Sequence, residues 1–287
     1  MEDSIGLEIG GFRCRAHAAS PDVRLFLAPE LRPFAASDGP WDLSFLVKRV
    51  RPHLPAGLVL RFASSGVWHL YTGNGSLWLS FTLPGAVTPY RVASLDLHLS
   101  HGELQVEAAR AANPVDPWEY PLSELLVVFL LAEGRGVLLH ASALVDRGEA
   151  CLFVGESGAG KSTMTRLWAG SGVHFLSDDR TILRRHGTRC WAYGTPWHGD
   201  AGVASPGKAP LGKLFFLQKA AGHAVRPLAP REGLTRLLVN CFPTFWDPDG
   251  MAFTLGFLAQ LVQEIPCYEL AFSRDAGVVD VVRSIRD

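Results

Sequence analysis

The residues with the clearest chemical meaning stand in one short loop, GESGAGKST, at positions 155–163. Gly155 precedes Gly160, Lys161 and Ser162 by four intervening residues, which satisfies the phosphate-loop pattern. Glycines let the backbone turn tightly, so that successive amide hydrogens point at phosphate oxygens. The lysine of such a loop bridges the terminal phosphates, and the hydroxyl after it ligates magnesium. The motif predicts a site for a nucleotide or a polyphosphate tail.

A strand precedes this loop in the sequence pattern and a helix follows it, which is the setting that the motif requires. The alternative is a plain strand-to-helix turn with a solvated lysine. Lys161 is assigned to phosphate binding and catalysis and Ser162 to the metal, whereas Thr163 is expected to cap the helix or to pack. The predicted cofactor-binding residues are Gly155, Glu156, Ser157, Gly158, Ala159, Gly160, Lys161, Ser162 and Thr163.

Two adjacent carboxylates, Asp178 and Asp179, end the apolar segment VHFLSDD. We expect this segment to be a buried strand beside the loop strand. One carboxylate can then hold magnesium, and the other can take a proton from an attacking hydroxyl. An isolated Asp-Asp pair is more often a helix cap or a turn, but the flanking pattern favours a functional pair.

His140 begins the pair of strands that leads into the loop, in LLHASALV. A histidine within an apolar strand is usually a satisfied core residue. At this place in the pattern it can instead orient an acceptor or stabilise charge near the aspartates.

The elements around these residues indicate an α/β protein with a mixed sheet, preceded by a smaller β-rich domain. Residues 5–108 read mostly as strands, with a hairpin at 72–76 and a segment at 41–50 that also fits a short helix. Three prolines at 112–121 suggest the boundary. We predict domains at 1–115 and 116–287.

Composition excludes several classes of protein. The 287 residues carry a formal charge of −1 and are 48% hydrophobic, so nothing general attracts nucleic acid or anionic lipid. Five scattered cysteines suggest neither disulfides nor a zinc site and fit a reducing compartment. His98 and His101 are expected on opposite faces of a strand and therefore not at a metal. With no signal peptide and no apolar run long enough to span a bilayer, we expect a cytoplasmic protein.

The segments HASALVDRGEACLFVGESGAGKST and VHFLSDD resemble the catalytic domain of the HPr kinase/phosphorylase family, which is related to ATP-dependent phosphoenolpyruvate carboxykinases. The likeness covers residues 135–215. It implies ATP and Mg²⁺ as cofactors and transfer of the γ-phosphoryl group to a serine hydroxyl. Carried over by position, Lys161 and Ser162 bind phosphate and metal. Asp178 and Asp179 are the acidic pair, with Asp178 at the metal and Asp179 as base, and His140 is the active-site histidine.

The chain departs from that family after the aspartates, where AYGTPWHGDAG replaces the glutamate-arginine-glycine stretch. This puts phosphorolysis in doubt, and we expect the segment to form the acceptor-side wall, with His198 and Asp200 as its ionisable groups. In this respect the chain is more similar to HPr-kinase-like enzymes that modify ribosomally made peptides, including lasso peptides.

The expected function is therefore a serine kinase acting on a peptide or small protein. A nucleotide-binding or hydrolysing regulator and a kinase for a small metabolite such as free serine are the alternatives. The sequence leaves base specificity and homo-oligomerisation open.

Overall fold

The computed structural model describes residues 3–37, 39–107 and 114–285. The chain divides into two compact units, Met1–Leu125 and Leu126–Asp287. Helix α1 (Leu122–Ala132) contains the point of division. Part of the proline-rich segment at 112–121 lies outside the described residues, as does Ala108.

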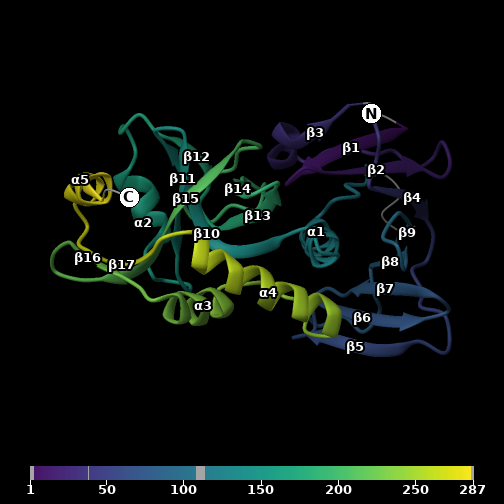
Figure 1. The fold of residues 1–287 in the computed structure, drawn as a ribbon. Helices are drawn as coiled ribbons and strands as arrows, with labels where there is room; N and C mark the ends of the chain where they lie inside the picture. Colours follow the sequence, from purple (N-terminus) through teal and green to yellow (C-terminus); the bar gives the residue numbers. More distant parts are fainter. Residues whose placement is uncertain (1–2, 38, 108–113, 286–287) are drawn as a thin grey trace. The chain divides into compact units, whose positions relative to one another are not determined.

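Within its described residues, the first unit holds a nine-stranded mixed sheet in the order β3-β1-β2-β4-β9-β8-β7-β6-β5 (Figure 1). Strands β2, β4 and β9 run parallel, and the other neighbours are antiparallel. A 3-10 helix, Pro29–Phe34, precedes β3. The strands are β1 (Ser4–Ile9), β2 (Phe12–Ala18), β3 (Ala35–Ala36), β4 (Leu43–Arg49), β5 (Val59–Ser64), β6 (Trp68–Gly73), β7 (Ser76–Phe81), β8 (Arg91–Asp96) and β9 (His101–Val106).

The hairpin predicted at 72–76 is present, since β6 and β7 pair across it. Its two turn residues, Asn74 and Gly75, have the positive φ values of 53° and 69° that such a turn needs. The short helix considered at 41–50 is wrong. Leu43, Phe45 and Val47 are buried alternately along β4, and that period of two belongs to a strand.

Two further apolar segments of this unit are not strands. Residues 23–28 form no strand beyond an isolated bridge between Leu25 and Val115. His98 lies in a turn rather than in a strand; its backbone N–H donates to Oδ1 of Asp96 at 3.1 Å. Both segments are apolar enough to resemble strands, but neither has a neighbouring strand within the described residues to complete a ladder.

Residues 126–285 build a second mixed sheet of eight strands, in the order β11-β10-β13-β14-β15-β17-β16 with β12 paired to β10. Because β11 pairs with both β10 and β15, five of these strands close into a ring. The strands are β10 (Val137–Asp146), β11 (Glu149–Val154), β12 (His174–Ser177), β13 (Arg180–His186), β14 (Arg189–Tyr193), β15 (Lys208–Lys219), β16 (Ala224–Pro227) and β17 (Cys267–Phe272).

Helices cover both faces of this sheet (Figure 1). Along β11, Phe153 packs with α2 and α5, whereas its neighbours Leu152 and Val154 pack with α3 and α4. This alternation follows from the period of two in a strand and gives an α/β layer structure. The helices are α2 (Lys161–Leu167), α3 (Pro230–Val239), α4 (Pro248–Glu264) and α5 (Gly277–Ser284).

Strands β11, β15 and β17 are parallel neighbours, so their carboxyl ends meet at one edge of the sheet. The glycine loop leaves that edge from β11. We predicted that the segment with the two aspartates lies beside the loop strand β11, and this is wrong. The segment lies one strand away from β11, because β12 pairs with β10. None of the helices in the described residues has the length and apolar character needed to cross a membrane.

Candidate functional site

The glycine loop connects β11 directly to α2, in the strand-loop-helix order expected from the sequence. Gly158 and Gly160 have φ values of +80° and +113°, which side chains other than glycine rarely adopt. A Cβ at Gly160 would lie 2.7 Å from the ring of Phe272, and one at Gly155 would lie 2.6 Å from Cβ of Ala159. The glycines are therefore required both for the turn and for close packing.

Lys161 lies inside this loop and is only 6% exposed. Its ammonium donates to the carbonyl oxygens of Gly155 at 2.7 Å and Glu156 at 3.2 Å. Burial lowers the pKa of Lys161; the charges of Asp179 and Asp178 oppose that shift, and Arg180 adds to it. The ammonium is thus close enough to the aspartates to interact with them electrostatically.

The loop offers further donors. The backbone N–H groups of Ser157, Gly158 and Gly160 meet no acceptor among the described residues. The hydroxyl of Ser162, in the first turn of α2, has no hydrogen-bond partner there either. Together with Lys161, these groups match the donor set that a polyphosphate tail needs.

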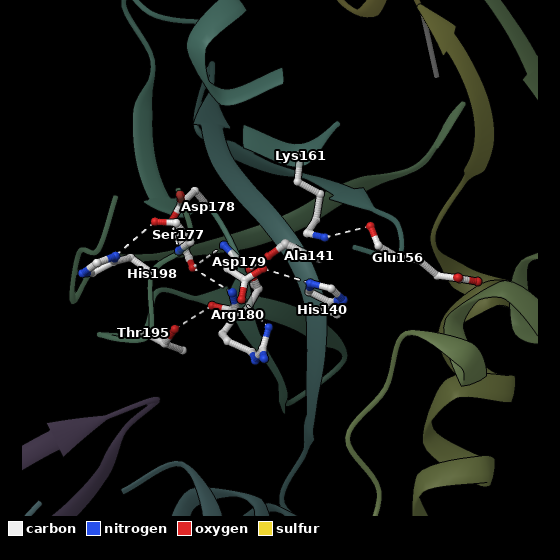
Figure 2. A network of polar contacts seen from close by, with 12 residues as sticks. His140, Ala141, Glu156, Lys161, Ser177, Asp178, Asp179, Arg180, Thr195 and His198 are labelled. Atoms are coloured by element: carbon white, nitrogen blue, oxygen red, sulfur yellow. Dashed lines mark hydrogen bonds and ion pairs between the residues drawn. The ribbon is translucent and has the colours of Figure 1, made fainter. Parts of the chain in front are cut away.

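Asp179 lies where β12 gives way to β13, and its side chain is 24% exposed. Nε2–H of His140, on β10, donates to its Oδ1 at 2.9 Å, and Arg180 is hydrogen-bonded to its Oδ2 (Figure 2). Burial would raise the pKa of Asp179, but the hydrogen bond from His140 and the charges of Arg180, His140 and Lys161 outweigh it. The pKa therefore lies below its ordinary value.

Figure 2 shows the side chain of Lys161 extending toward His140 and Asp179. The structure thus gathers the predicted lysine, histidine and second aspartate at one place.

Asp178 has a different environment from its neighbour. It is fully buried, and its two oxygens accept the backbone N–H groups of Gly199 at 2.9 Å and Ala201 at 2.7 Å. Gly199 also packs against Asp179, because a Cβ added there would lie 3.2 Å from Cβ of that residue. This geometry fits a residue that anchors the loop at 197–201 behind Asp179.

Of the two residues predicted to bind magnesium, Ser162 is therefore suited to it and Asp178 is not. Ser162 presents an unpartnered hydroxyl among the described residues, and Asp179 is the partly exposed carboxylate nearby. Asp178, the carboxylate predicted to bind metal, already accepts a hydrogen bond at each oxygen and is closed to solvent. The described residues contain no group of three or more His, Cys, Asp or Glu that could hold a metal by themselves, so most ligands would have to come from phosphate oxygens and water.

The segment 197–201 carries the two ionisable groups expected from the sequence. His198 contacts the carbonyl of Gly199 at 3.1 Å, and the carbonyl of Asp200 accepts from Arg166 at 3.1 Å. Tyr193, which precedes this segment, and Trp197, its first residue, are buried at 5% and 9% exposure and serve packing.

Sequence reasoning missed one wall of the site. The segment after α3 lies alongside β10, where the N–H of His140 donates to the carbonyl of Asn240 at 2.7 Å. This places Phe242 under the guanidinium of Arg180, 4.4 Å from carbon to ring centre, and beside the ring of His140. The aromatic run CFPTFW between two helices was the available signal.

All five cysteines are free, and Cys241 is the one that belongs to this wall of the site. The predicted absence of disulfides is therefore consistent with the structure.

Comparisons with known proteins identify no family for this chain and give a distant structural likeness. No family model matches the sequence, and no curated protein matches it. Among solved structures, the Hpr(Ser) kinase/phosphatase from Coxiella burnetii is similar over 51% of this chain and 90% of its own, with 16% identity and a TM-score of 0.29.

Proposed function

We propose that the chain is a kinase that uses ATP and Mg²⁺ to phosphorylate a serine hydroxyl of a peptide or small protein. One observation carries the proposal: a buried lysine in a glycine loop lies within electrostatic reach of a half-buried aspartate that a histidine and an arginine hold in place. An anion cradle facing an ionised proton acceptor is the arrangement that phosphoryl transfer to a hydroxyl requires.

In this proposal the amides of the loop and Lys161 bind the phosphates. The serine oxygen forms a bond to the γ-phosphorus as the bond to the oxygen of the ADP leaving group breaks. The serine proton passes to Asp179, whose lowered pKa keeps it ionised and able to accept at neutral pH. His140 orients that carboxylate through its 2.9 Å hydrogen bond. When bound, Mg²⁺ would neutralise charge on the phosphates, with Ser162 as its ligand from this chain.

Arg180 is a second cation at the same place. It contacts Asp179 and rests on Phe242, which fixes its orientation. We infer that Arg180 stabilises negative charge on the group being transferred, since a guanidinium suits planar recognition of phosphate oxygens.

The acceptor is the least constrained part of the proposal. A ribosomally made peptide, including the lasso type, is the class implied by the resemblance of the loop and the GTPW segment to HPr-kinase-like enzymes that modify such peptides.

The test is incubation of the full chain with γ-labelled ATP and Mg²⁺, separately with serine-containing peptides, with free serine and with no acceptor. The proposal expects label on peptide serine, with Asp179→Asn retaining ATP binding and losing transfer. Label on free serine alone would indicate a metabolite kinase. Label found only as inorganic phosphate under all three conditions would exclude both kinases and favour a hydrolysing regulator.

A further inference from the structure

A cluster of three polar side chains outside the proposed catalytic group lies at the same edge of the sheet. His223 ends the turn between β15 and β16, and Ser273 and Asp275 follow β17. Nε2–H of His223 donates to Oδ1 of Asp275 at 2.8 Å, and the Ser273 hydroxyl donates to Oδ2 at 2.5 Å. The N–H of Gly277 also donates to Oδ1, at 3.0 Å.

This cluster adjoins the glycine loop. Strands β15 and β17 continue past the last residue of β11, and Phe272, the final residue of β17, packs against Gly160 of the loop. Ser273 is the next residue in the chain. Ligands of α/β sheets bind outside the carboxyl ends of such parallel strands.

The order of the strands fixes the direction of a bound nucleotide. His140 and Asp179 belong to β10 and to the end of β12, on one side of the loop strand β11. Strands β15 and β17 lie on its other side. With the terminal phosphate facing Asp179, a nucleotide that lies along this edge of the sheet extends over β15 and β17, toward the cluster.

Asp275 is suited to a hydroxyl donor there. Its side chain is 62% exposed, whereas that of His223 beneath it is 15% exposed. Oδ1 already accepts two hydrogen bonds, but Oδ2 accepts one and keeps a lone pair. Hydrogen bonds from Ser273, His223 and Gly277 hold its pKa at about 2, so the acceptor is charged at neutral pH.

We propose that Asp275, supported by His223 and Ser273, accepts a hydrogen bond from a ribose hydroxyl of the nucleotide held by the glycine loop. The inference rests on the proposed function, because it requires a nucleoside triphosphate at that loop. It makes this edge of the sheet a subsite that distinguishes ribonucleotides from a bare polyphosphate chain.

The experiment measures binding of ATP, 2′-deoxy-ATP, 3′-deoxy-ATP and inorganic tripolyphosphate to the full chain by calorimetry. A hydrogen bond to a charged group predicts that one deoxy analogue binds about tenfold more weakly than ATP. Asp275→Ala should abolish that difference and leave tripolyphosphate affinity unchanged.

Because Asp275 also accepts the N–H of Gly277, the first residue of α5, two controls accompany it. Asp275→Asn keeps an oxygen for the N–H of Gly277 and should still lose the discrimination. Asp247→Asn alters the cap of α4, where Asp247 accepts from Asp249 and Gly250, and should leave every affinity unchanged. Equal affinities for ATP and both deoxy analogues in the wild type would overturn the ribose subsite alone. Failure of the wild type to bind any of the four ligands would overturn the proposed function itself.

Discussion

At the scale of single residues, Asp179 and Asp178 are neighbours in the chain with different environments. Asp179→Asn should leave ATP affinity within about twofold and lower transfer by about 10²–10⁴-fold, because the proton acceptor is lost while the phosphate cradle stays intact. Steady-state labelling and calorimetry on the same preparation check this. An Asn variant of full activity would remove Asp179 from the base position.

Lys161 gives a prediction about pH. Its folded pKa lies below the ordinary 10.5, so the unfolded chain binds more protons between the two values. The difference in free energy of unfolding between the wild type and Lys161→Met should therefore be independent of pH near neutrality. It should shift in favour of the wild type as the pH increases toward 10.5. Urea unfolding of both proteins across that range measures it, and a constant difference would contradict the buried, desolvated lysine.

At the scale of elements, the loop at 197–201 depends on Asp178. Asp178→Ala leaves the part-buried N–H groups of Gly199 and Ala201 without their acceptors, and each such loss costs up to about 1–3 kcal/mol. We expect a lower free energy of unfolding and weaker transfer with ATP affinity retained, as measured by urea unfolding and labelling. If Asp178 instead bound the metal, its loss would mainly weaken the Mg²⁺ dependence of ATP binding.

The junction between the loop and β17 makes a second prediction for elements. Gly160→Ala should destabilise the chain more than Gly158→Ala, although both glycines have positive φ values. Each substitution carries a backbone cost of about 1–3 kcal/mol, but only a Cβ at Gly160 also meets Phe272. Thermal unfolding of the two variants compares them. Equal losses of stability in the two variants would show that the ring of Phe272 moves aside without a cost in free energy.

At the scale of the whole molecule, a ligand that binds only the folded chain raises its stability. ATP at about 100 times its dissociation constant should add about 2.7 kcal/mol to the free energy of unfolding. Lys161→Ala should show no such gain, because the buried ammonium that faces the phosphates is absent. Thermal unfolding with and without ATP and Mg²⁺ tests both proteins. A similar gain in the variant would place the nucleotide elsewhere.

The sequence was sufficient for the local parts of this protein. The spacing from Gly155 to Ser162 predicts the strand-loop-helix unit, because short-range backbone geometry depends on residues that are close in the chain. The spacing of apolar residues, with a period of two in strands and of 3.6 in helices, likewise predicts most strands and helices of the second unit. It failed at 41–50, where a mixed apolar segment fits either period until a neighbouring strand selects one.

Only the tertiary structure decided which strands are neighbours and which side chains meet. It paired β12 with β10 rather than with the loop strand, closed Asp178 beneath two backbone amides, and brought Phe242 against Arg180. Strand order and burial arise from contacts between residues far apart in the chain, which no local pattern specifies. The sequence by itself determined the chemical groups available to this protein, and the fold determined which of them face the same phosphate loop.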